Sequence, residues 1–149
     1  MGLRVIKSVN WILLICPLSL MGYVEEKETQ GEQVERVVRD LQDENEDVRW
    51  NAVEVLRQMG SLDTVTVLME ALKDENEDVR WNAVEALKEI GALDAVPALM
   101  QVLKDQNEDV RWNVVQALEK IGTPEALKAV EEYQSQQYAD TFIKSVDVE

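Results

Sequence analysis

DENEDVRWNAVEALKEIG, residues 74–91, decides the fold because the chain contains this stretch three times with few changes. DENEDVRWNAVEVLRQMG occupies residues 43–60 and DQNEDVRWNVVQALEKIG occupies residues 105–122, so corresponding residues are 31 positions apart. The segments between the copies align at the same offset. A fixed period of about 20 to 50 residues is the mark of a solenoid, in which each repeat packs only on its neighbours.

Each copy predicts two helices. In the middle copy, Asn76 suits an N-cap and Gly91 suits a C-terminal stop, which predicts a first helix over residues 77–90. Asp94 suits the N-cap of a second helix, which tolerates Pro97 in its first turn. Because the connections are short, the two helices must be antiparallel. We therefore expect an all-α fold, an α-solenoid of about three 31-residue helix pairs.

Apolar residues at helical spacing before the first copy predict that the array begins with half a repeat. In the last copy, Thr123 and Pro124 mark the start of a second helix that we expect to end near Gln137. The expected division is a signal peptide or N-terminal anchor (1–22), an acidic linker (23–31), a capping helix (32–42), three repeats (43–73, 74–104 and 105–137) and a tail (138–149).

The first segment has the layout of a secretory signal peptide. Arg4 and Lys7 precede an apolar run over residues 11–21, which is shorter than a bilayer-spanning helix and contains Pro17. An uncleaved anchor remains an alternative, as does lipidation at Cys16, and either would attach the chain to a membrane. We expect export to a periplasmic or extracellular location.

The composition narrows the classes of partner and chemistry. Thirty acidic and fifteen basic residues give a formal charge of −15, which disfavours nucleic acid and favours basic partners. The chain has no histidine, the commonest general base and transition-metal ligand, and Cys16 is its only cysteine. We expect no catalytic residues, no metal and no cofactor.

The spacing of Asp74, Val79-Arg80, Ala83, Ala86-Leu87 and Ile90-Gly91, repeated in each copy, resembles the HEAT-like repeats named after phycobilisome lyases. This resemblance covers about residues 33–133. It implies a right-handed superhelix of stacked helix pairs, with an N-terminal half-repeat here, that mostly binds other proteins. It also implies a structural role between repeats for the arginines and the loop acids, namely Arg49, Arg80, Arg111, Asp43, Asp74 and Asp105.

A helical wheel of residues 77–90 predicts an exposed stripe opposite the core. Indole rings flanked by carboxylates suit lysine or arginine side chains, and asparagine amides suit a peptide backbone. We call Trp50, Trp81 and Trp112 the Trp ladder. We expect it on the concave side, where its spacing matches about three residues of an extended peptide. The expected partner-binding residues are Glu46, Asp47, Trp50, Asn51, Glu54, Glu77, Asp78, Trp81, Asn82, Glu85, Glu108, Asp109, Trp112, Asn113 and Gln116.

Three alternatives stay open. The first is that Trp covers the seam between repeats, with Asn bonding along the array. The second is a calcium loop, because DENEDVRWNAVE matches that pattern except for its glycine, which Val48 and Val79 replace. The third is an enzyme or enzyme accessory subunit similar to the bilin lyases.

Overall fold

The structure, a computed structural model, describes residues 29–146, and every regular element in that range is a helix. The α-helices are α2 (Gln30–Asp40), α3 (Glu46–Met59), α4 (Val65–Ala71), α5 (Glu77–Ile90), α6 (Val96–Val102), α7 (Glu108–Ile121) and α8 (Pro124–Val146). Short 3₁₀ helices, η2 (Leu62–Thr64) and η3 (Leu93–Ala95), lead into α4 and α6.

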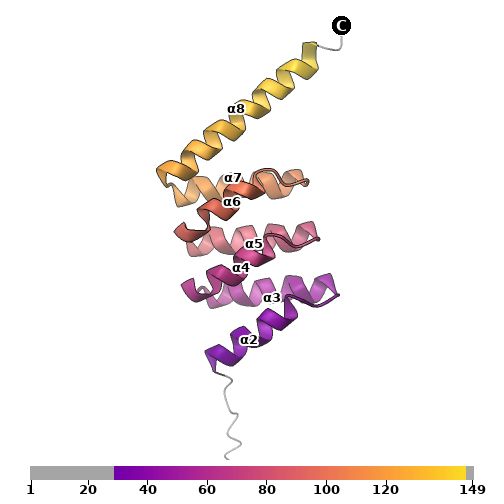
Figure 1. Cartoon of the computed structure of the whole chain (residues 1–149), viewed down its shortest axis with the longest axis vertical. Helices are drawn as coiled ribbons and strands as arrows, with labels where there is room; N and C mark the ends of the chain where they lie inside the picture. The colour runs from indigo at the N-terminus through magenta and orange to yellow at the C-terminus, as the bar shows by residue number, and fades with distance from the viewer. Residues whose placement is uncertain (1–28, 147–149) are drawn as a thin grey trace, which may run out of the picture.

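The helices form two layers of an α-solenoid (Figure 1). We call α3, α5 and α7 the inner layer, because α3 packs directly on α5 and α5 directly on α7. We call α2, α4, α6 and α8 the outer layer. These helices cross the inner ones obliquely, and α8 projects beyond the end of the stack. The layered arrangement agrees with the predicted all-α solenoid.

Each inner helix begins with an asparagine N-cap and ends at a glycine with positive φ. The side chain of Asn76 accepts hydrogen bonds from the N–H groups of Asp78 and Val79, at 2.8 and 3.2 Å. Gly91 closes the helix with φ of 68°, a conformation that costs other residues energy. As a result α5 spans the range that the sequence predicts.

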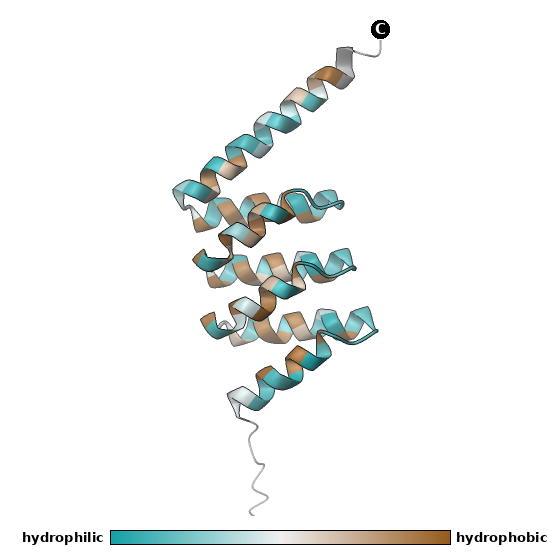
Figure 2. Cartoon of the chain, viewed as in Figure 1, coloured by the Kyte–Doolittle hydropathy of each residue, from teal (hydrophilic) through white to brown (hydrophobic). Residues whose placement is uncertain are grey.

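The core lies between the two layers and is aliphatic. Its fully buried leucines recur at repeat spacing on the inner helices, at Leu56, Leu87 and Leu118, and face Leu68 and Leu99 of the outer helices. The loops that lead into the inner helices are coloured hydrophilic in Figure 2. Burial of these apolar residues, about 1.5–3 kcal/mol for each large side chain, holds neighbouring repeats in one register.

Three expected boundaries differ from the structure. Asp94 does not cap α6, because it lies inside η3 and the residue before α6 is Ala95, which has no capping side chain. α8 continues to Val146 instead of ending near Gln137, since the tail contains neither Gly nor Pro to stop it. α2 already begins at Gln30, where Thr29 and Glu32 form a capping box.

The expected signal peptide or anchor lies outside the described residues. Within residues 29–146, the helices are too short or too polar to traverse a lipid bilayer.

Candidate functional site

The three tryptophans of the Trp ladder occupy equivalent positions on the inner helices. Trp50 and Trp81 are 39% and 41% exposed, whereas Trp112 is 64% exposed. The difference arises because no further inner helix follows α7 within the described part of the chain. The expected acids Glu46, Asp47, Glu77, Asp78, Glu108 and Asp109 are also exposed.

A surface hollow of about 370 Å³ separates the first two indole rings. Glu46, Asp47, Trp50, Asn76, Asp78 and Trp81 line it, so it combines two aromatic side chains with three carboxylates and has no basic residue. The Asn76 amide donates from Nδ2 to Glu46 Oε2 at 2.8 Å and fixes one of the carboxylates. The ladder and its acids therefore converge at the junction of the first two repeats.

Asn76 is the lining residue that sequence analysis missed as part of the site, because its capping role alone explained it. Its Oδ1 caps α5, which leaves the two hydrogens of Nδ2 for another acceptor. Asn45, Asn76 and Asn107 occupy all three N-cap positions, where Asp or Ser would cap as well but would not bring this amide donor. The use of asparagine at all three N-caps was the sequence signal that could have identified Asn76 as a residue of the site.

The predicted exposure of the asparagines that follow the tryptophans is wrong for two of them. Asn82 and Asn113 are only 3% and 2% exposed. Asn82 Nδ2 donates to the carbonyl oxygen of Trp50 at 3.4 Å, and Asn113 Nδ2 donates to that of Trp81 at 3.2 Å. These amides lie in the seam between repeats because the preceding inner helix covers them, so they are not available to a partner's backbone.

Asn51 provides the matched comparison for this seam bond. It is exposed, since no inner helix precedes α3 in the described range, and it donates to Asp47 O of its own helix at 2.7 Å. We expect Asn82→Ala to lower the free energy of unfolding by about 1 kcal/mol, because it removes a buried hydrogen bond between α3 and α5. Asn51→Ala should change it by less than about 0.5 kcal/mol. Urea denaturation of both variants measures the difference, and equal losses would contradict the assignment.

Two further residues of the expected stripe are engaged within the chain. Glu54 accepts from Arg57 Nη2 at 2.7 Å and from Gln58 Nε2 at 2.9 Å, and Glu85 forms an ion pair with Lys88. The bond from Arg57, followed by that from Gln58, lowers the pKa of Glu54 to about 2. Arg57 also reaches Glu89 of the next repeat at 2.8 Å, so this cluster couples α3 to α5.

The low pKa of Glu54 predicts an acid-sensitive contribution to stability. A carboxylate with a depressed pKa stabilises the fold above its ordinary value of 4.5 and loses that contribution as the pH falls through about 2. We expect urea midpoints to fall between pH 4.5 and pH 2, and to fall less in Glu54→Gln. The exposed Glu44→Gln serves as the control and should follow the wild type. A Glu54→Gln variant with an unchanged pH profile would contradict the prediction.

The loop acids and arginines form an ordered series across the repeats. Arg49 donates from Nε and Nη2 to Asp74 at 2.8 and 3.0 Å, and Arg80 donates in the same way to Asp105 at 2.7 and 2.8 Å. Each arginine also donates from Nη1 to the carbonyl oxygens of its own loop. This is the bridging that the sequence resemblance implies for these two arginines.

The two ends of the series differ from its middle. Arg111 has the Tyr133 hydroxyl at 3.2 Å where the others have a carboxylate, and no arginine within residues 29–146 donates to the Asp43 carboxylate. Burial opposes ionisation of Asp105, but the bonds from Arg80 and from the Asn107 N–H outweigh it and hold the pKa of Asp105 below its ordinary value. The bond to Asp105 likewise raises the pKa of Arg80.

Comparison with protein families identifies the repeat family of this helical stack. A family model described as HEAT repeats matches residues 34–99 and again residues 65–141, which together cover more than half of the chain. The chain belongs to the HEAT repeat family. The comparison does not distinguish the phycobilisome-lyase type of HEAT-like repeat from other types.

A solved structure supports the same architecture for the HEAT array. The chain is similar to the crystal structure of an engineered protein from the Northeast Structural Genomics Consortium, with a TM-score of 0.50 and 22% sequence identity. The match covers 68% of this chain and 51% of the engineered one, so the chain spans about half the length of the structure it matches. At this identity the similarity concerns the fold alone. A comparison with curated proteins gave no match.

In this HEAT array, acids of the calcium-loop pattern have partners within the chain. The Asp74 carboxylate accepts from Arg49 and from the Asn76 N–H, and Glu85 pairs with Lys88 on α5. No group of three or more His, Cys, Asp or Glu side chains suited to a metal ion occurs among the described residues. The acidic turns are used for helix capping and ion pairs between repeats.

Proposed function

We propose that this HEAT array is a non-catalytic scaffold that binds basic segments of other proteins on the face that carries the Trp ladder. The hollow between Trp50 and Trp81 is the observation that supports this proposal. HEAT repeats typically provide binding surfaces, and the family match therefore favours a scaffold over an enzyme. We also propose that these repeats are of the phycobilisome-lyase type, as the sequence resemblance implies.

The chemistry of the hollow favours a cationic side chain. A lysine or arginine placed against an indole face gains about 0.5–1 kcal/mol at an exposed site, and more where water is excluded. Glu46, Asp47 and Asp78 surround that position with acceptors for charge-assisted hydrogen bonds. The formal charge of −15 would also speed the approach of a basic partner.

The role of the asparagines changes what the ladder would recognise. Since the amides of Asn82 and Asn113 are used between repeats, the array recognises the side chains of the partner and not its backbone. A basic segment in either extended or helical conformation would therefore satisfy the site. We further propose that the protein works after export, in a periplasmic or extracellular location, either free or held to the membrane by its N-terminal segment.

Titration calorimetry of the full chain with oligolysine and oligoglutamate peptides tests the proposed function. Oligolysine should bind and weaken as salt is added, because part of its attraction is long-range and screened. It should still bind at physiological ionic strength, where the indole contacts remain, whereas oligoglutamate should not bind. Failure of oligolysine to bind at low salt would rule out the proposal.

A further inference from the structure

A second set of surface hollows lies on the outer layer, and it repeats with the same period as the sequence. One hollow lies between α2 and α4, one between α4 and α6, and one between α6 and α8. Equivalent residues of consecutive repeats line them: Val38, Leu41 and Gln42 in the first, Met69, Leu72 and Lys73 in the second, and Met100, Leu103 and Lys104 in the third. We call them the outer grooves.

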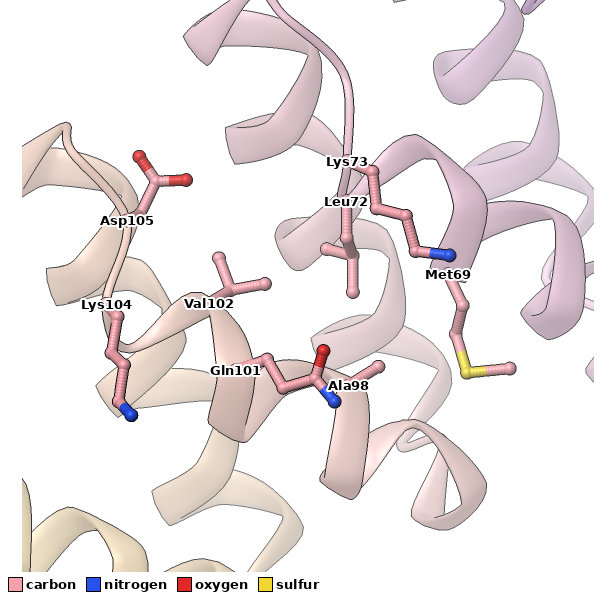
Figure 3. A pocket seen from close by; sticks show the side chains of 8 residues that line it. All are labelled: Met69, Leu72, Lys73, Ala98, Gln101, Val102, Lys104 and Asp105. Atoms are coloured by element: carbon pink, nitrogen blue, oxygen red, sulfur yellow. The ribbon is translucent and has the colours of Figure 1, made fainter.

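Each outer groove has an apolar floor that is open to solvent. The cavities measure about 370, 230 and 270 Å³ in chain order, enough for a large aliphatic or aromatic side chain at each position. In the groove between α4 and α6, Leu72 and Val102 point toward one another, and Met69 and Ala98 extend the apolar surface (Figure 3). The grooves exist because the outer helices, unlike the inner ones, do not pack closely side by side.

Basic side chains border the second and third grooves, in contrast to the acidic ladder face, whereas Glu70 and Asp74 line the first groove. Lys104 lines both the second and the third groove, and no carboxylate in residues 29–146 lies within ion-pair distance of it. Asp105, which lines the second groove, is paired with Arg80 in a shielded ion pair, whereas Glu132, which lines the third, has only an exposed pair with Lys128 at 3.6 Å. Lys73, across from Lys104 in Figure 3, has only an exposed pair with Glu70 at 3.2 Å, which contributes little. The unpaired charge at the second groove, between α4 and α6, is therefore positive.

We infer that the outer grooves dock an amphipathic helix of a partner protein that carries an apolar residue at every seventh position and acidic residues beside it. Packed helices in a stack lie roughly 8–10 Å apart, and we expect the outer helices, which pack more loosely on one another than the inner ones do, toward the wide end of that range. A helix advances about 10.5 Å in seven residues, which brings one apolar side chain to each groove. In a strand, side chains on one face recur at about 6.7 Å or 13 Å, and neither spacing fits. Acidic flanks complement Lys73 and Lys104.

NMR titration of the full-length, isotope-labelled chain tests this docking surface. The probe is a synthetic helical peptide with leucine at every seventh position and glutamate on both flanks. The expected result is saturable binding with the largest shifts at the methyl groups of Met69, Met100 and Ala98, and none at the indole N–H groups of Trp50 and Trp81. The same peptide with its leucines moved to three-residue spacing should bind weakly or not at all.

Charge reversal supplies the matched pair of variants. Lys104→Glu should weaken binding of the peptide by about fivefold, because it replaces an attraction by a repulsion of similar size. Lys120→Glu makes the same change on α7, away from the outer grooves, and should have less than a twofold effect. Equal effects of the two variants, shifts confined to the ladder face, or no binding would each overturn the inference. Since oligolysine tests the ladder face separately, a failure here leaves the proposed function standing.

Discussion

Arg80→Ala should lower the free energy of unfolding by about 3 kcal/mol, whereas Arg111→Ala, the same change one repeat later, should cost clearly less. The Arg80 and Asp105 side chains are only 13% and 8% exposed, so removal of the guanidinium leaves a shielded carboxylate without its counter-ion. Breaking such a pair is far more costly than losing an exposed one. Arg111 makes the same bonds to its own loop but faces the Tyr133 hydroxyl, which carries no charge.

Urea denaturation followed by circular dichroism measures both losses. The ordering is the informative result, because each substitution removes the same side chain and the same loop contacts. Equal losses for the two variants would show that the arginines stabilise only their own loops. A double variant of Arg80→Ala with Asp105→Asn should be less destabilised than the sum of its parts, since the two residues act on each other.

Replacement of both Trp50 and Trp81 by alanine should weaken oligolysine binding at physiological ionic strength by about tenfold. Two indole contacts of about 0.5–1 kcal/mol each or more account for a loss of this size. The substitution leaves the net charge unchanged, so the loss cannot be attributed to a weaker overall field. Because both rings are about two-fifths exposed, the fold should survive with a modest loss of stability.

Leu62→Ala with Leu93→Ala is the matched control for this double variant. These leucines are also 31 residues apart and are 73% and 62% exposed, but they lie in the turns before the outer helices. The control should bind oligolysine as the wild type does. If the tryptophan variant also binds unchanged, the indoles take no part in recognition.

The fold was largely predictable because its determinants are local and occur three times. The Asn76 cap, the Gly91 stop and the apolar spacing between them fix α5 without any knowledge of its neighbours. The end of α8 was not predictable in this way. Its second half mixes polar and apolar residues and has no stop residue, so the sequence offers no boundary to find.

The candidate site was harder to predict because a helical wheel assumes that each helix packs against a single neighbour. An inner helix of a solenoid has an outer helix on one side and an inner helix on each flank, so a wider arc of it is buried. Val84 is fully buried although the wheel places it well away from Val79. Asn82 lies only about 60° from Val79 on the wheel, nearer the core than Trp81, and the flanking helix α3 covers it. Only the central strip, with Trp81 and the first-turn acids, matches the prediction.

The ring N–H signals of the tryptophans, followed by two-dimensional NMR during titration of the full chain with oligolysine, test the central claim most directly. The chain has four tryptophans, and Trp11, in the N-terminal segment, serves as an internal reference. If a cationic side chain enters the hollow between the first two repeats, the signals of Trp50 and Trp81 should shift together and saturate with one binding constant. Binding that leaves both signals in place while the backbone signals of other acidic segments move would contradict the account.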